Sequence, residues 1–230
     1  MSTRANKWEY VQLGVIAAMF VWAAVEWSAL PDRIPVHWNA AGVVDGYAGK
    51  FVGLLLPPVV TLAVYLALRY LPRIDPVRAN YASFAGTYLL VRTVVVVSMA
   101  FSFVVAVVAI ANEGAVPKDR LEVGAVAVLF VILGGAMGKF RPNWFVGIRT
   151  PWTLSSKVSW VKTHRVGGRV FVGVGLATLV VALISGKAAL YTLVALTVVG
   201  IVYLVIYSYI VWRDDPEKVP AQDTGPADDS

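Results

Sequence analysis

Residues 88–111, YLLVRTVVVVSMAFSFVVAVVAIA, form a long apolar run that carries a single charged residue, Arg92. A helix needs about 20 apolar residues to cross the roughly 30 Å hydrocarbon core of a bilayer. Lipid offers no hydrogen bonds to peptide groups, so a spanning segment has to satisfy its backbone internally, as a helix does. The run therefore predicts a membrane-spanning helix.

Five further apolar runs accompany this one along the chain. They cover residues 10–30, 51–71, 121–138, 170–186 and 188–211. With 58% hydrophobic and 15% charged residues, the 230-residue chain lies outside the composition of ordinary soluble domains. The first run contains Glu26 and lacks a small-residue cleavage pattern, so we expect it to be a retained span and not a signal peptide. We predict an all-α, polytopic integral membrane protein with six transmembrane helices.

The basic residues predict the orientation. Short cytoplasmic loops carry an excess of Lys and Arg. The loops on the side of the N-terminus hold 14 of these residues and the opposite loops hold five. Both termini and the loop between helices four and five should therefore be cytoplasmic. The net charge of +6 then reflects topology and attraction to anionic lipid, because it is spread around apolar spans in a way that does not suit nucleic-acid binding.

Three parts follow from this arrangement. Residues 1–71 form an N-terminal module of two helices with an outer loop at 31–50, where the second helix should kink at Pro57-Pro58. Residues 72–213 form a second membrane domain of four helices. Residues 214–230 are acidic and rich in proline and small residues, which predicts a disordered tail.

A polar block interrupts the apolar pattern at residues 138–170, GKFRPNWFVGIRTPWTLSSKVSWVKTHRVGGRV. Thr150-Pro151 is a suitable helix start, with threonine as the cap and proline at the first position. We expect an amphipathic helix over residues 153–165 that lies along the membrane and ends at Gly167-Gly168. Gly147 gives the backbone freedom before Arg149, whose guanidinium can bind carbonyls of the loop or a partner.

Several candidate residues have both a structural and a functional interpretation. Trp144, Trp152 and Trp160 suit interface anchors better than a ligand cage. His164 is expected to hydrogen-bond the loop or meet lipid phosphate, and His37 with Asn39 and Asp45 forms either a hydrogen-bonded turn or an outer recognition surface. Glu26 is a functional candidate or an interfacial residue, and Arg92 is expected to extend to the interface.

Catalysis and metal binding have little support in the sequence. The chain has no cysteine, which excludes disulfides, iron–sulfur clusters and thiolate zinc sites. Its two histidines, His37 and His164, are predicted on opposite sides of the bilayer, so we expect no shared metal site. No catalytic triad, phosphate-binding glycine loop or catalytic carboxylate pair is evident. We expect no catalytic residue, no cofactor and no enzyme activity.

Two motifs resemble the SdpI family, bacterial membrane immunity proteins against a secreted sporulation-delaying toxin. The signature is carried by Gly138-Lys139, Pro142-Asn143, residues 147–155 (GIRTPWTLS), Trp160, residues 162–165 (KTHR) and Gly168. The outer loop resembles the small uncharacterised module that often precedes this signature, through Leu30-Pro31, residues 34–37 (IPVH), Asn39, Gly42, Asp45-Gly46 and Lys50. One departure concerns Lys157 and Val158, which stand where family members often carry an acidic pair.

The resemblance implies a multi-pass protein of the bacterial cytoplasmic membrane that protects the cell from a peptide toxin. It also implies signalling by recruitment of a transcriptional repressor to the membrane. Recognition on the outer side is assigned to Pro35, His37, Asn39, Asp45 and Glu26. Partner contact on the cytoplasmic side is assigned to Asn143, Gly147, Arg149, Thr150, Trp152, Trp160 and His164. Two alternatives stay open: a small transporter that uses Glu26, Pro57-Pro58 and Arg92, and a lipid-organising protein that uses the basic Trp-rich block.

Overall fold

Six long apolar helices make up most of the protein. The computed structural model describes residues 3–39, 42–112 and 116–218. The helices are α1 (Thr3–Glu26), α2 (Leu56–Ile74), α3 (Ala85–Ala111), α4 (Lys118–Met137), α6 (Lys157–Ala182) and α7 (Gly186–Arg213). A π-helical turn, η1 (Phe51–Leu55), leads into α2, and a 3-10 helix, η2 (Arg78–Phe84), leads into α3. All six spans are long and apolar enough to cross a membrane, which confirms the predicted number.

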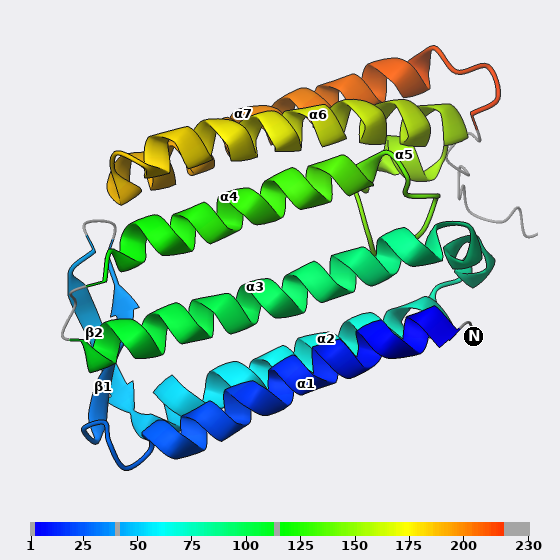
Figure 1. Ribbon diagram of the computed structural model, residues 1–230. Coiled ribbons are helices and arrows are strands. Elements are labelled where there is room, and N and C mark those ends of the chain that lie inside the picture. Colours follow the sequence, from blue (N-terminus) through cyan, green and yellow to red (C-terminus); the bar gives the residue numbers. More distant parts are fainter. Residues whose placement is uncertain (1–2, 40–41, 113–115, 219–230) are drawn as a thin grey trace, which may run out of the picture.

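The helices lie side by side in one elongated bundle (Figure 1). α1 and α2 pack on α3, α3 packs on α4, and α4 packs on α6, which in turn contacts α7. The start of α1, η2, the short helix α5 (Pro151–Leu154) and the end of α7 share one end of the bundle, here called the signature end. The opposite end, here called the hairpin end, carries the two strands. The side of the membrane that each end faces stays a prediction from the basic residues.

A β-hairpin covers the hairpin end, and the all-helical expectation missed it. Strand β1 (Arg33–Trp38) pairs in antiparallel fashion with β2 (Val44–Gly49), with a register shift on either side of His37. Ile34 anchors the hairpin, since it is fully buried with Leu54 and Phe103 in the core of the N-terminal helices. A side chain at Gly53 would collide with Ile34, so this glycine allows η1 to approach the strand.

Small residues set the contact between α4 and α6. A Cβ atom at Gly134 would lie 2.7 Å from the carbonyl oxygen of Gly168, and one at Gly168 would lie 2.6 Å from that of Gly134. About two turns further along α6, a Cβ atom at Gly175 would lie 2.6 Å from the carbonyl oxygen of Ala127. Close backbone approach at small residues is the usual way in which membrane helices associate. The prediction that Gly167-Gly168 ends a helix is therefore wrong, because both glycines lie inside α6.

The interfacial helix expected at residues 153–165 is also wrong. The start at Thr150-Pro151 is confirmed, and Thr150 caps α5 by accepting the Thr153 N–H at 3.1 Å. That helix is a single turn, however, because Ser156 caps a new helix by accepting the Ser159 N–H at 2.9 Å. From there α6 continues without a break to Ala182. Its first turns bury Ser159, Trp160 and His164 against the bundle, so they do not lie along the membrane surface.

The connections near the proline residues follow the predictions in part. No kink is described at Pro57-Pro58, where one was predicted; a π-helical turn ends just before them at Leu55, and both prolines lie in the first turn of α2. Pro72 lies inside α2, and the chain leaves the helix at Asp75, before Pro76. Because α3 contacts both α2 and α4, the domain boundary at 71/72 stays a prediction.

Candidate functional site

The polar block folds into a compact loop at the signature end, and Asn143 organises it. The Asn143 amide nitrogen donates to the carbonyl oxygens of Arg141 (2.9 Å) and Val146 (3.0 Å). Its amide oxygen accepts the N–H groups of Phe145 (3.0 Å) and Val146 (2.6 Å). The side chain is 1% exposed, so these four bonds replace the water that the loop backbone would otherwise need.

His164 fixes the next part of the loop. Its Nε2 accepts the backbone N–H of Ile148 at 3.0 Å, and its Nδ1 lies 2.8 Å from the carbonyl oxygen of Trp160. An N–H can only donate and a carbonyl can only accept, which makes the ring neutral with its proton on Nδ1. Gly147 sits against the ring with φ +111°, where a side chain would meet the imidazole. The expected hydrogen bond between His164 and the loop is confirmed.

Trp160 is an interior residue and not an interface anchor. It is fully buried, stacks on His164 with ring centroids 4.0 Å apart, and donates its indole N–H to the Phe140 carbonyl at 3.0 Å. A tryptophan buried in this way fills the core and satisfies its one polar group. The other two indoles differ: Trp144 is 54% exposed, and Trp152 is half-buried and packs edge-on against Tyr209 of α7.

A buried carboxylate connects this loop to the N-terminal helices. Asp75, at the end of α2, accepts the Tyr81 hydroxyl at 2.9 Å and the backbone N–H of Trp144 at 3.0 Å. Asn80 adds a second connection by donating to the Pro142 carbonyl at 2.7 Å. Sequence reasoning missed Asp75, although an aspartate between a helix end and a proline is typical of an Asx turn, and Asp75 accepts the Val77 N–H at 2.9 Å. The two halves of the molecule therefore share one hydrogen-bonded network at this end.

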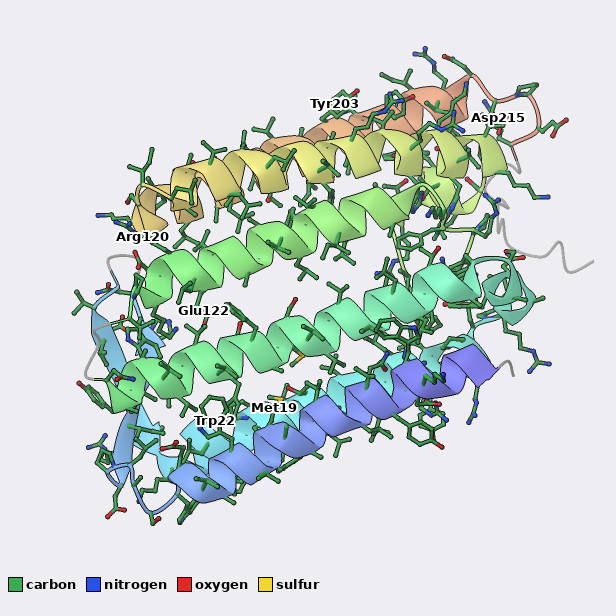
Figure 2. All side chains as sticks on the ribbon, viewed as in Figure 1. Met19, Trp22, Arg120, Glu122, Tyr203 and Asp215 are labelled. Atoms are coloured by element: carbon green, nitrogen blue, oxygen red, sulfur yellow. The ribbon has the colours of Figure 1, made fainter. Side chains whose placement is uncertain are left out.

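A second missed carboxylate connects the block to the end of α7. Ser156 donates to Asp215 at 2.5 Å, and the Glu217 N–H donates to the same carboxylate at 3.0 Å. These bonds hold the pKa of Asp215 below its ordinary value. Nearby, Thr150 lies 3.1 Å from the Ser208 hydroxyl. Asp215 marks this end of the bundle in Figure 2.

The signature residues thus divide into a buried and an exposed set. Asn143, Thr150, Trp160 and His164 are at most 8% exposed, so the hypothesis that their side chains touch a partner does not fit their burial. Arg149 is exposed and donates to the Trp144 carbonyl at 2.7 Å, which supports its structural interpretation while leaving the side chain accessible. The surface open to a partner includes Trp144, Arg149 and Leu154.

A large pocket opens at the hairpin end, between the inner face of the hairpin and the ends of α3, α4 and α7. Its volume is about 830 Å³, which lies within the range of ligand pockets. The helices give it an apolar floor that includes Ile110, Val123 and Leu190. The charged and aromatic groups of its wall are Arg33, Trp38, Tyr47, Lys118, Asp119 and Glu122.

Two charged groups of the pocket wall, Lys118 and Glu122, are held in place by neighbouring side chains. The Lys118 ammonium lies 4.0 Å from the centroid of the Trp38 ring and 3.5 Å from the Glu122 carboxylate. Glu122 also accepts the Ser102 hydroxyl of α3 at 2.7 Å (Figure 2). The pocket therefore combines an apolar floor with fixed charges of both signs, a lining suited to an amphipathic ligand.

The outer residues predicted from the sequence separate into two faces. Pro35 and Asn39 line the pocket. His37 and Asp45 do not line it; they pair with each other across β1 and β2 at 2.5 Å, and their side chains are 69% and 42% exposed. Glu26 is not in the pocket either, and it accepts the indole N–H of Trp22 at 3.0 Å.

A cluster of buried charges was missed near the signature end. Glu9 of α1 pairs with Arg69 of α2 and lies 3.6 Å from Arg92 of α3. Besides Glu26, the helices contain Glu9 and Glu122, which the sequence prediction did not single out. Arg92, which was expected to extend to the interface, lies between the helices, because its side chain is 12% exposed and donates to Gln12 at 3.0 Å.

Comparisons with known proteins agree with both motifs. Residues 139–208 match the SdpI/YfhL protein family, and residues 14–62 match a domain of unknown function, DUF1648. The chain is also 23% identical over 207 residues to the immunity protein SdpI of Bacillus subtilis (strain 168), covering 88% of this chain and 95% of that protein. No solved structure matches. The resemblance to the SdpI family is confirmed, and the protein is a multi-pass membrane protein whose apolar helices contact lipid.

Proposed function

We propose that this protein is an immunity protein of the bacterial cytoplasmic membrane that protects its cell from a secreted peptide toxin. The similarity to an immunity protein along most of both chains supports this function. That relative's name describes no enzyme, which agrees with the catalytic groups missing from the sequence. The observation that carries the proposal furthest is the pocket of about 830 Å³ at the hairpin end, the end that the basic residues assign to the outside.

The pocket is the proposed recognition site. A peptide that acts on membranes is amphipathic, so it needs an apolar surface and polar partners together. Ile110, Val123 and Leu190 supply the apolar surface, and Arg33 and Asp119 supply charges of both signs. Tyr47 adds an aromatic side chain that is 56% exposed and therefore available for contact. Exposed aromatic residues next to a pocket are frequent anchors of binding energy.

The signature end is the proposed docking surface for a cytoplasmic repressor. Its buried network of Asn143, Trp160 and His164 holds the loop in one shape, while Trp144, Arg149 and Leu154 are presented to the partner. Lys157 and Val158 follow directly and are also exposed, so the departure from the acidic pair of other members lies on this surface. We therefore expect the chain to differ from those members in the regulator that it binds.

The transporter alternative has less support. Glu26 lies at the hairpin end of α1, whereas Arg92 lies beside Glu9 and Gln12 towards the other end of the same helix. The intramembrane polar groups proposed for transport are thus not gathered into one site. No arrangement among the described residues favours the lipid-organising alternative for the Trp-rich block, because Trp160 faces the core.

Survival of toxin-sensitive cells tests the proposal. The full chain is expressed in Bacillus subtilis cells that lack their own immunity protein, and in cells that produce any peptide encoded beside the gene. Protection against at least one of these peptides is expected, with no protection from a chain truncated before α4 and present at equal amount in the membrane. Absence of protection against all of them would contradict the proposal.

A further inference from the structure

A second cavity lies between α1, α2 and α3 on the signature side of the bundle. Its volume is about 190 Å³, and its charged lining residues are Glu9, Arg69 and Arg92. A single water needs only about 10–15 Å³ of such space, so the cavity has room for a larger group. Arg69 is 26% exposed, and the cavity therefore reaches the protein surface at α2.

The lining carries more positive than negative charge. Two guanidinium groups face one carboxylate, and a single oxygen of Glu9 serves Arg69, Arg92 (3.6 Å) and the Tyr65 hydroxyl (3.1 Å). One carboxylate cannot neutralise two arginines, which stay charged at any physiological pH. Such an excess is costly in a membrane protein unless a further anion compensates for it.

One arginine also has an unused donor. The terminal nitrogen of Arg92 donates to Gln12 at 3.0 Å, but its Nε is buried without a partner. A buried donor without an acceptor is unfavourable. The nearby tyrosine hydroxyls are already committed, since Tyr88 donates to the Leu68 carbonyl at 2.5 Å and Tyr81 donates to Asp75 at 2.9 Å. The donors left for a ligand are therefore the guanidinium N–H groups of Arg69 and Arg92 that line the cavity and are not used by Glu9 or Gln12.

The depth of the cavity suits a lipid phosphate. α3 has 27 residues and is about 40 Å long, so its ends extend beyond a hydrocarbon core of roughly 30 Å. Arg92 lies about 10 Å from the first residue of α3, near the boundary between hydrocarbon and headgroups. Side chains on a helix point towards its N-terminus, and for α3 this is the signature end. The guanidinium thus reaches towards the headgroup layer.

We propose that this cavity binds a phosphate oxyanion, carried by the headgroup of an anionic phospholipid or present as inorganic phosphate. Arg69 and Arg92 supply the charge and the forked donors that such oxyanions prefer. Glu9 holds both arginines in position and at the same time competes with the ligand for them. Removing the charge of an arginine should therefore weaken binding of the oxyanion, whereas removing the charge of Glu9 should strengthen it.

Binding is measured on the purified full chain in a neutral detergent, by native mass spectrometry and by thermal stabilisation. The three probes are phosphatidylglycerol, phosphatidylcholine and inorganic phosphate. If an anionic lipid supplies the phosphate, we expect phosphatidylglycerol to bind in preference to phosphatidylcholine. If free phosphate is the ligand, we expect inorganic phosphate to stabilise the protein. Stabilisation by neither phosphatidylglycerol nor phosphate would overturn the proposal.

Variants separate binding from a purely structural role. Arg92→Gln should weaken binding of the preferred probe about tenfold, the effect of one lost charge-assisted hydrogen bond. Glu9→Gln should strengthen it, because the competing charge is removed. Arg73→Gln is the matched control, since Arg73 stacks on Tyr70 and does not line the cavity. If Glu9→Gln and Arg92→Gln both lower the melting temperature and leave the probe preference unchanged, the cluster is structural and the proposal is wrong.

Discussion

The backbone N–H of Ile148 donates a hydrogen bond of 3.0 Å to Nε2 of His164, which joins the signature loop to the second turn of α6. Gly147 precedes this contact with φ +111°, a conformation that L side chains rarely adopt. The most polar segment of an apolar chain is thus held by a buried histidine and a glycine. Both residues belong to the motif that resembles the SdpI family, and the contact gives each of them a structural role in this chain.

Gly147→Ala should destabilise the protein. The left-handed backbone costs a non-glycine residue roughly 1–3 kcal/mol, and the new methyl group would also collide with His164. Thermal unfolding in detergent should show a lower melting temperature. Gly138→Ala is the matched control, because Gly138 has φ −65° and open space around its Cα. An unchanged melting temperature for Gly147→Ala would contradict the described loop.

Asn143→Ala should destabilise the signature loop by about 2 kcal/mol or more. The substitution leaves the N–H groups of Phe145 and Val146 without their acceptor, and unmade buried hydrogen bonds cost about 1–3 kcal/mol each. Limited proteolysis within residues 138–156 should become faster. Asn112→Ala should leave cleavage unchanged there, since Asn112 is exposed and lies at the opposite end of α3. Equal cleavage rates in both variants would rule out the proposed role of Asn143.

Gly168→Ala should weaken the packing of α4 on α6. The added methyl group would meet the Gly134 carbonyl oxygen at 2.6 Å, and overpacking of this kind costs about 1–3 kcal/mol. Gly173→Ala is the control on the same helix, because nothing lies within 4 Å of a Cβ placed there. A lower free energy of unfolding is expected for the first variant only. If both variants unfold alike, the close approach of the two helices is not a determinant of stability.

Asp215 should make the end of α7 sensitive to acid. Its folded-state pKa is lowered by the hydrogen bonds from Ser156 and Glu217, so its contribution to stability is present above the ordinary value of 3.8 and is lost as the pH falls through the lowered folded-state pKa. We expect the protection against hydrogen exchange around Ser156, relative to an unfolded chain at the same pH, to fall in acid in the natural protein. In Asp215→Asn that protection should already be lower at neutral pH and should change less with acid. A pH response identical to that of the natural protein would contradict this assignment.

The sequence predicts the membrane part of this fold well for a physical reason. Lipid leaves a spanning backbone no choice but a helix, so apolar runs such as residues 88–111 determine both the number and the type of the spans. Polar segments have more alternatives. Caps at Thr150 and Ser156 are also compatible with a helix that lies on the membrane surface. Only the burial of Trp160 and His164 against the bundle shows that this segment is the first part of the long helix α6.

Contacts between distant parts of the chain could not be predicted in the same way. Nothing local to Asp75 indicates that it binds the N–H of Trp144, and nothing local to Glu9 indicates that α2 and α3 bring two arginines to it. The hairpin was missed because its strands are short and its anchor, Ile34, is recognisable only once Leu54 and Phe103 are placed beside it. For the same reason the sequence indicated Pro35 and Asn39 as recognition residues of the outer loop without locating the pocket that they line.

The most direct test of toxin recognition compares two side chains of the same hairpin. Tyr47 lines the pocket, whereas His37 does not line it and makes an exposed contact with Asp45, of a kind that contributes little to stability. The measurement is the lowest toxin concentration that stops growth of sensitive cells expressing each variant at equal membrane abundance. We predict that Tyr47→Ala lowers this concentration about tenfold, as expected for the loss of one binding anchor, and that His37→Ala leaves it unchanged. Full protection by Tyr47→Ala, or loss of protection in His37→Ala alone, would contradict the assignment of recognition to the pocket.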